Sequence, residues 1–337
     1  MTESLPLLVL SAADVRAALP MENCIDALHH AICALDEGKA INPLRSKMAL
    51  SAGNGLLGLM PAEISSIGMT GIKIVTVLPG NHGTEYDSHQ GGVFLFETER
   101  GQPLALADAA EITAIRTGAA SALATRALAR NGAGDLAIIG SGVQARSHLA
   151  ALMADRTLRR IQVWSRNPIH AQRFAQQAGG RHRITIEIAA SVEEAVTQAD
   201  IICTTTSAAE PILKGDWVQS GTHINAVGSS VPHTREVDSA LIQKSSVFVD
   251  RRESALNEAG DLLFPIQEKC FAAEDIRAEL GEVLNGKKRG RQSAEEITLF
   301  KSLGLGIYDL IAIHQSYIKA QELGLGVTVP FGELRNV

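Results

Sequence analysis

The stretch Leu136–Ala150, LAIIGSGVQARSHLA, decides the fold of this chain. A short apolar run leads into Gly140-Ser141-Gly142-Val143-Gln144-Ala145, which has the form G-x-G-x-x-A, and a helix-forming stretch follows. The first glycine permits a tight turn, the second lets a pyrophosphate approach the backbone, and the small Ala145 allows close packing of helix on strand. The free N–H groups of the helix attract phosphate. The stretch therefore predicts a dinucleotide site, with a turn that binds no ligand as the alternative.

The sequence downstream of this turn alternates between short apolar runs and helical stretches. The runs that predict strands are DLAIIG (135–140), RIQVWS (160–165), ITIEIA (184–189), DIICTTT (200–206), HINAVG (223–228) and SVFVD (246–250). Strands that alternate with helices are typical of a parallel sheet covered on both faces. We expect an α/β fold with a Rossmann-type domain over residues 118–311.

The N-terminal third predicts a second domain of mixed α+β type. Its strand-like runs are LPLLVL (5–10), GLLGLM (55–60), TGIKIVTVLP (70–79) and a hairpin over 91–108 that turns near 99–102. A capping box of Ser11 and Asp14 predicts one short helix, and Pro20 suits the first turn of another. Two long helices are also expected, the first of them over 109–130. The second, over 295–326, is expected to return to this domain. The substrate-binding and dimerisation domain is therefore predicted to be discontinuous, over 1–117 and 312–337.

Composition excludes several classes of function. The net charge of -6 gives no overall attraction to nucleic acid or to an anionic membrane. No apolar run approaches the ~20 residues that cross a bilayer, and the N-terminus does not resemble an export signal. The cysteines are scattered without a Cys-x-x-Cys pair and indicate reduced thiols. We expect a cytoplasmic protein, and interpret the basic run at 286–291 as a solvated loop.

The end of the second predicted strand favours one cofactor. An NAD site usually has an acidic residue there, which binds the ribose 2′-hydroxyl. This chain has Ser165, Arg166 and Asn167 instead, so no carboxylate repels a 2′-phosphate and a guanidinium is present to bind it. We expect NADP(H), and use of NAD(H) as well remains open. The alternative for Arg166 is an ordinary surface arginine.

Three cations precede the nucleotide-binding domain: Arg45, Lys73 and Arg116. Lys73 lies in an apolar strand-like run, and Arg116 lies in ITAIRTGAA, which has no obvious local carboxylate. Because charges are seldom buried without a partner, a substrate carboxylate would satisfy them. Internal salt bridges are the alternative. The residues alone indicate a nucleotide-dependent enzyme that acts on a small carboxylate.

Over nearly its whole length the chain resembles the ornithine cyclodeaminase/mu-crystallin family, and within it the ketimine reductase branch. The stretches that carry the resemblance are GIKIVTVLPGN, SHQGGVFLFE, ITAIRTGAASALATRALA, IIGSGVQARSH, VWSRN, EPIL, HINAVGSSVP, EAGDLL, ELGEVLNGK and TLFKSLG. The resemblance implies a homodimer with a substrate-binding domain and a Rossmann-type domain. It also implies that Arg45, Lys73 and Arg116 line the substrate-carboxylate site, with Lys73 and Arg116 catalytic. The cofactor contacts expected on this basis are Ser88, His89, Arg116, Thr117, Gly140, Gly142, Val143, Gln144, Ser165, Arg166, Asn167, Thr205, Thr206, Val227 and Ser302.

One departure distinguishes the branches of the family. Cyclodeaminases and the related alanine dehydrogenases carry an aspartate after the AVG strand, as an acid and base over the substrate. This chain has Ser230, whose hydroxyl does not exchange a proton near neutral pH, and we expect it to contact substrate. Its alternative is a helix cap or turn residue. Reduction of a ready-made cyclic imine needs only a protonated C=N and a hydride, so the missing acid favours a reductase.

The expected substrates are Δ1-pyrroline-2-carboxylate and Δ1-piperideine-2-carboxylate, which give L-proline and L-pipecolate. The proton would come from solvent, with His89 or Lys73 as alternative donors. A cyclodeaminase, a hydroxyproline dehydratase, an amino-acid dehydrogenase and a non-catalytic NADPH- or small-ligand-binding protein remain alternatives. His82, His223 and His233 have no metal-ligand spacing, and no metal is expected.

Overall fold

The computed structural model describes residues 4–51, 55–81 and 84–333, and the chain divides into two compact units. The first unit comprises Met1–Arg116 and Leu305–Val337, and the second comprises Thr117–Gly304. The sequence placed the second junction at 311/312, which lies inside a helix. The structure has it in the loop before that helix, so the whole helix belongs to the first unit.

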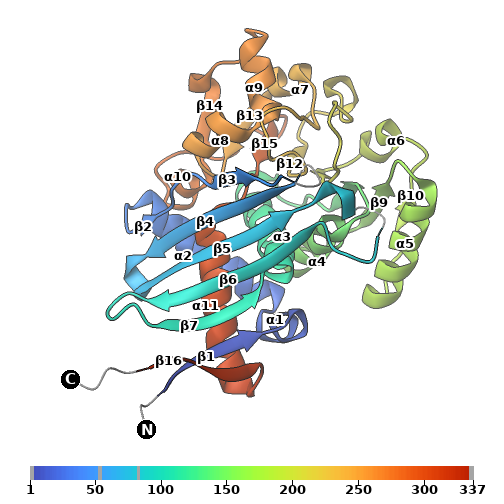
Figure 1. The fold of residues 1–337 in the computed structure, drawn as a ribbon. Coiled ribbons are helices and arrows are strands. Elements are labelled where there is room, and N and C mark those ends of the chain that lie inside the picture. The colour runs from blue at the N-terminus through green and yellow to red at the C-terminus, as the bar shows by residue number, and fades with distance from the viewer. Residues whose placement is uncertain (1–3, 52–54, 82–83, 334–337) are drawn as a thin grey trace. The chain divides into compact units, whose positions relative to one another are not determined.

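The second unit is built on one parallel sheet of eight strands. Its strands are β8 (Asp135–Ile139), β9 (Arg160–Trp164), β10 (Glu187–Ile188), β11 (Ile201–Thr204), β12 (His223–Ala226), β13 (Ser245–Val249), β14 (Ile276–Glu279) and β15 (Ile297–Lys301). Its helices are α4 (Val143–Asp155), α5 (Pro168–His182), α6 (Val192–Val196), α7 (Ser239–Lys244), α8 (Arg252–Glu258), α9 (Gly260–Gln267) and α10 (Leu280–Leu284). The α/β alternation expected from the sequence is confirmed (Figure 1).

The glycine turn follows β8, the strand at which the order of strand addition reverses from one side of the sheet to the other. The order is β10-β9-β8-β11-β12-β15-β13-β14, and every pair in it is parallel. From β8 the chain first builds outward through β9 and β10, and then returns to β11 on the other side of β8. Ligands of open α/β sheets bind beyond the carboxyl ends of the strands at such a switch point. The turn that follows β8 is therefore well placed for a dinucleotide.

One expectation about the second unit is wrong. The stretch 295–326 was predicted to be a single helix, but Ile297–Lys301 is the interior strand β15 and the helix begins only at Gly306. All five residues of β15 are buried, and it pairs with β12 and β13. A short apolar run buried on both faces has no period that separates a strand from a helix, so its local pattern was ambiguous.

The first unit is an eight-stranded mixed sheet with helices on one face. Its strands are β1 (Ser4–Leu10), β2 (Ala40–Ile41), β3 (Ser46–Ala49), β4 (Leu56–Ile64), β5 (Met69–Val77), β6 (His89–Glu97), β7 (Pro103–Asp108) and β16 (Val327–Glu333). Its helices are α1 (Ala12–Ala18), α2 (Met21–Asp36) and α11 (Gly306–Leu323), and α3 (Ala109–Leu128) begins in this unit. The expected capping box of Ser11 and Asp14 at α1 is confirmed.

Helix α11 packs closely on the centre of this sheet, behind β4, β5 and β6 in Figure 1. A Cβ atom at Gly71 of β5 would lie 3.0 Å from the Leu310 side chain, and one at Gly306 would lie 2.7 Å from the Pro61 carbonyl oxygen. The start of α11 is fixed because Ile307 N donates to Asn42 Oδ1 at 3.0 Å. Small residues at the crossing thus bring the first turns of α11 against β5. No helix within the described ranges is long and apolar enough to span a membrane.

Candidate functional site

Apart from Thr117, the expected cofactor residues of the second unit share one edge of its sheet. Each of five adjacent strands, β9, β8, β11, β12 and β15, is followed directly by one group of them. The groups are Gly140–Gln144, Ser165–Asn167, Thr205 with Thr206, Val227, and Ser302. Because the strands are parallel, their carboxyl ends meet at the same edge. The structure therefore brings together residues that are up to 162 positions apart in the sequence.

The glycine turn has the geometry that a phosphate-binding loop requires. Gly140 has a φ of 121°, and a Cβ atom there would lie 2.7 Å from Thr205 Oγ1, so only glycine fits. Gly142 is the N-cap of α4, and a Cβ atom at Gly142 would meet no atom within 4 Å. The side chain of Val143 is 49% exposed, whereas that of Ala145 is buried against the sheet. The N-terminus of α4 is thus open to an anion.

Two buried polar atoms at this edge support a fit to a dinucleotide. Gln144 Oε1 and Ser302 Oγ are buried and have no hydrogen-bond partner within the described chain. Buried polar atoms are rarely left without a hydrogen bond in native proteins, so each of these two atoms indicates a bound ligand or an ordered water. Both atoms belong to residues expected to contact the cofactor. The residues present therefore fit a nicotinamide dinucleotide in the second unit.

The Ser165–Asn167 turn presents one exposed cation. Ser141 Oγ donates to Ser165 Oγ at 3.0 Å, which ties the turn to the glycine loop. Asn167 caps α5 by accepting from Ile169 N at 3.0 Å. Arg166 is exposed, and no ion pair found in the described ranges includes it. Its guanidinium is therefore accessible to an anion from solvent.

A buried carboxylate that the sequence did not reveal organises two of these strand ends. Glu236 accepts hydrogen bonds from Thr204 Oγ1 (2.7 Å), Thr206 N (2.7 Å), Thr206 Oγ1 (2.7 Å) and Gly228 N (2.6 Å). Burial, and then the nearby Asp261 carboxylate, raise the pKa of Glu236 against the opposing effect of these donors. Its partners lie 8 to 32 positions away, so no local pattern marks it.

The loop after β12 contains Val227 and Ser230. Val227 N donates to Thr204 O at 3.1 Å, and its side chain is 9% exposed. Ser229 is structural because its hydroxyl donates to Thr234 O at 2.6 Å. Ser230 is partly exposed at the same strand end, so it lies at the edge of the sheet where the other expected cofactor residues are.

In the first unit, two of the three predicted cations meet around a carboxylate. Lys73 Nζ lies 2.9 Å from Asp309 Oδ2, and Arg116 Nε donates to Asp309 Oδ1 at 3.0 Å. The three side chains are between 1% and 6% exposed. The carboxylate that Arg116 contacts is not local in the sequence: Asp309 lies 193 residues further along the chain. The cluster therefore has two cations and one anion and keeps a net positive charge.

The electrostatics of this cluster perturb Lys73. Burial lowers the pKa of Lys73 to about 8, with Arg116 and Arg45 contributing in the same direction and Asp309 opposing them. The influence of Arg45 places this residue, from the loop between β2 and β3, within electrostatic range of Lys73. Lys73 Nζ also donates to Thr113 Oγ1 at 3.3 Å. All three predicted cations thus contribute to one positive region of the first unit.

The remaining expected residues belong neither to the strand ends of the second unit nor to the Lys73–Asp309–Arg116 cluster. Ser88 and His89 lie at the start of β6, where Ser88 Oγ and His89 Nδ1 are 3.0 Å apart and the His89 side chain is exposed. Thr117 is 6% exposed on α3 and is the first residue of the second unit. His82 lies outside the described residues. His223 is buried with Nδ1 2.9 Å from Thr298 Oγ1, and the described ranges contain no cluster of metal-binding side chains.

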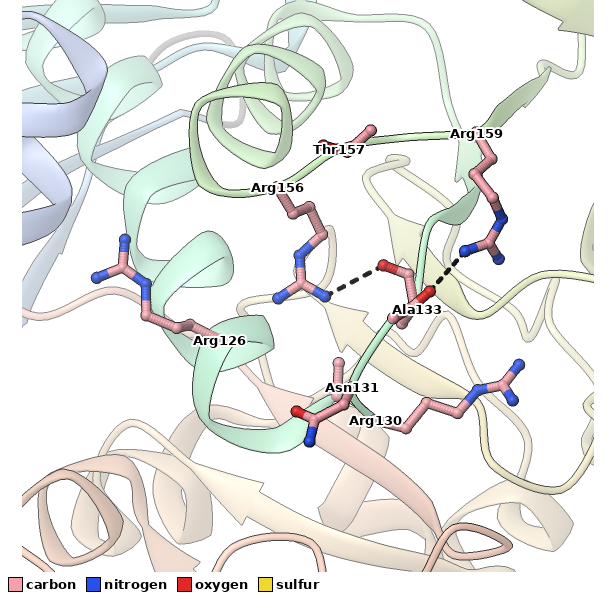
Figure 2. A pocket seen from close by; sticks show the side chains of 9 residues that line it. Arg126, Arg130, Asn131, Ala133, Arg156, Thr157 and Arg159 are labelled. Atoms are coloured by element: carbon pink, nitrogen blue, oxygen red, sulfur yellow. Dashed lines mark hydrogen bonds between the residues drawn. The ribbon is translucent and has the colours of Figure 1, made fainter.

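A pocket in the second unit lies at the opposite edge of its sheet (Figure 2). Its lining precedes the amino ends of β8 and β9 and contains four arginines. The lining residues are Arg126, Ala129, Arg130, Asn131, Gly132, Ala133, Arg156, Thr157 and Arg159. The arginines pair with Asp135, Asp155 and Asp200. This pocket is therefore not the strand-end edge expected to hold the dinucleotide.

The chain is similar to known proteins over most of its length. Residues 7–323 match the family model of the ornithine cyclodeaminase/mu-crystallin family. A Delta(1)-pyrroline-2-carboxylate reductase of Bacillus cereus is 38% identical over 96% of this chain and 100% of its own. The ketimine reductase mu-crystallin of Mus musculus is 41% identical over 83% of this chain and 86% of its own.

A solved structure extends the similarity to three dimensions. The Delta(1)-pyrroline-2-carboxylate reductase of Thermococcus litoralis, in complex with NADH and L-proline, superposes with a TM-score of 0.93 at 39% identity, covering 96% of this chain and 100% of that one. The family match covers far more than half of the chain, and the fold agrees along almost all of it. This chain therefore belongs to the ornithine cyclodeaminase/mu-crystallin family.

Proposed function

We propose that this chain is an NADPH-dependent reductase of cyclic ketimine carboxylates, which converts Δ1-pyrroline-2-carboxylate to L-proline and Δ1-piperideine-2-carboxylate to L-pipecolate. The observation that carries the proposal is the buried cluster of Lys73 and Arg116, whose charge Asp309 balances only in part. A buried excess of positive charge is costly without an anion. A substrate carboxylate supplies one. The similarity to reductases over nearly the full chain supports the same activity.

The residues of the first unit bind and orient the substrate. Arg116 contacts Asp309 through Nε, so its two terminal nitrogens form the edge that would pair with a carboxylate in bidentate fashion. Lys73 and Arg45 would add positive charge beside it. Fixing the carboxylate positions the C=N bond, because the carboxylate is bonded directly to the imine carbon.

The second unit would hold the cofactor. Gly140, Gly142, Val143 and Gln144 would bind the pyrophosphate, Thr205, Thr206, Val227 and Ser302 would border the nicotinamide half, and Ser88, His89, Arg116 and Thr117 are further proposed contacts. When bound, the reduced nicotinamide supplies a hydride to an electrophilic carbon. Arg166 would bind the 2′-phosphate, which favours NADP(H) over NAD(H).

Ser230 favours reduction over cyclodeamination. A serine hydroxyl does not take up or release a proton near neutral pH, and cyclodeamination needs several such transfers. Reduction of an iminium that enters already protonated needs no acid at this place. Ser230 would instead contact the substrate by a hydrogen bond.

The test of this function is a substrate panel with NADPH and NADH, followed at 340 nm. We expect rapid loss of absorbance with either cyclic imine. The amount of L-proline or L-pipecolate formed should equal the amount of NADPH oxidised. Slow turnover is expected with pyruvate and methylamine, an open-chain oxo acid and amine offered in place of the cyclic imine. Proline formed from ornithine without net use of cofactor would contradict the proposal.

The open face of the first sheet supports a homodimer. On β4, β5, β6 and β7 the inward residues pack beneath the helices. The other face has polar residues near the strand ends (Glu63, Thr70 and Thr76) and, between them, a group of apolar, only partly buried side chains: Leu57, Leu59, Ile72, Ile74, Phe94, Phe96, Leu104 and Leu106. Phe331 of β16 is 57% exposed and lies 6.5 Å from Phe94, ring centre to ring centre. A contiguous apolar face of this kind is typical of an interface.

Light scattering should give twice the mass of one chain, and Phe94→Asp should give a single-chain mass. A single-chain mass for the unaltered protein would contradict the dimer.

A further inference from the structure

We propose that Asp309 is a positioning residue of the substrate site, which keeps the buried Lys73 ammonium charged at neutral pH and holds it beside Arg116, so that both meet one carboxylate. This inference rests on the proposed function for the identity of the ligand. The geometry of the Lys73–Asp309–Arg116 cluster itself does not depend on it.

The packing of α11 makes the position of Asp309 specific. Asp309 lies in the first turns of α11, next to Leu310, which contacts the backbone of β5 at Gly71. Its two carboxylate oxygens engage different cations, Oδ2 at Lys73 and Oδ1 at Arg116. The carboxylate therefore fixes the spacing of two like charges, which would repel each other without it.

The surroundings of Lys73 leave Asp309 as the counter-charge. In the strand register, the residues beside Lys73 are Met60 on β4 and Val93 on β6, and both are apolar and buried. Among the described residues, the charged groups with the largest influence on Lys73 are Asp309 from α11, Arg116 from α3 and Arg45 from the β2–β3 loop. The Cys24 thiol of α2 interacts with Arg116, and burial raises the pKa of Cys24 to about 12, so it stays neutral.

Lys73 would lose its proton at neutral pH if this carboxylate were removed. Burial lowers the pKa of Lys73 to about 8, and Asp309 is the group that opposes a larger fall. A carboxylate within ~4–6 Å shifts a neighbouring pKa by about 1–3 units. A neutral Lys73 amine would attract a substrate carboxylate far less than an ammonium does.

The direct test measures the titration of Lys73 in the cofactor-free protein. Carbon NMR of protein labelled at lysine Cε reports each ammonium, and loss of one resonance in Lys73→Met assigns Lys73. We expect a midpoint near 8 in the unaltered protein, and a midpoint at least about one unit lower in Asp309→Asn. Asp309→Glu should return it toward the original value. An unchanged midpoint in Asp309→Asn would overturn the proposal. So would a midpoint below pH 7 in the unaltered protein, a result that does not depend on the folding of Asp309→Asn.

A binding experiment separates positioning from a merely structural role. Calorimetry of L-proline with the cofactor-free protein should show affinity falling as Lys73 loses its proton, and Asp309→Asn should move this fall to lower pH. At a pH one unit below the variant's own Lys73 midpoint, the variant should keep affinity within about threefold of the original. A structural defect would lower affinity equally at every pH and would contradict the proposal.

The matched control is Asp155→Asn, which removes another buried carboxylate that contacts two arginines, Arg126 and Arg156, in the second unit. It should leave the titration of Lys73 unchanged. If the unaltered protein binds no ring carboxylate, the proposed function fails, while the Lys73 titration still decides the role of Asp309.

Discussion

At the scale of single residues, the substrate site depends on an incomplete balance of charge. Lys73 and Arg116 share the carboxylate of Asp309, and the excess charge is what a substrate anion would neutralise. A neutral ligand of the same shape would leave this excess positive charge in place. The chemistry of the site thus follows from two cations and one anion in a space that water barely reaches.

Replacing Arg116 tests this balance. Arg116→Ala removes a bidentate partner, and charge-assisted hydrogen bonds contribute about 1.5–3 kcal/mol each, so kcat/KM for the cyclic imine should fall by about 100-fold or more. The control is Arg126→Ala on the same helix, where the side chain is 49% exposed and pairs with Asp155. Steady-state kinetics of the two variants decide the point, and equal kcat/KM values in both would remove Arg116 from the site.

Reversing the charge at Arg166 tests the choice of cofactor. Arg166→Asp should repel the 2′-phosphate and offer a carboxylate to a 2′-hydroxyl, which shifts the ratio of kcat/KM values toward NADH by at least about tenfold. Arg173→Asp makes the same change at an exposed position on α5 and should leave the ratio unaltered. A retained preference for NADPH in Arg166→Asp would show that another group binds the phosphate.

At the scale of secondary-structure elements, the ends of β11 and β12 are held together by Glu236. Glu236→Gln replaces one acceptor by an amide NH2 that faces donors, and an unsatisfied buried group costs about 1–3 kcal/mol. We expect weaker dinucleotide binding in a fluorescence titration and a lower free energy of unfolding in urea. Glu268→Gln, at a half-exposed carboxylate bonded to Arg235, is the control. Unchanged affinity in Glu236→Gln would mean that the strand ends need no such tie.

The sequence predicted elements best where the determining pattern is local. The β8–turn–α4 unit was predicted because its glycines and flanking apolar run lie within 15 residues, and the structure has both elements there. Strand β15 was taken for the start of a helix because a short buried run has no distinguishing period. Asp309 and Glu236 were missed because their partners are distant in sequence, and only the packing of α11 and the parallel sheet brings them together.

At the scale of the whole molecule, buried histidines link stability to pH. His148 lies between Ser121 Oγ (2.8 Å from Nε2) and Gln144 O (2.7 Å from Nδ1), and burial lowers its pKa to about 4. The unfolded chain binds a proton near pH 6.5, so it holds more protons than the folded chain between pH 6.5 and 4. Stability must therefore fall as the pH falls through this range.

We expect the free energy of unfolding to be about 2 kcal/mol lower at pH 5 than at pH 7 on account of His148 alone. Urea unfolding at the two pH values measures this difference. His148→Gln should reduce it, while His170→Gln, at an exposed site on α5, should not. The same dependence on pH in both variants would show that other groups control acid stability.

The central claim is that Lys73 and Arg116, held by Asp309, bind the carboxylate of a cyclic imino acid. The most direct measurement is a crystal structure of this protein with the oxidised dinucleotide and L-proline. We expect the proline carboxylate within about 3 Å of Lys73 Nζ and of the terminal nitrogens of Arg116, at normal hydrogen-bond distance. A proline carboxylate bound elsewhere, with Lys73 and Arg116 in contact with Asp309 alone, would contradict the account.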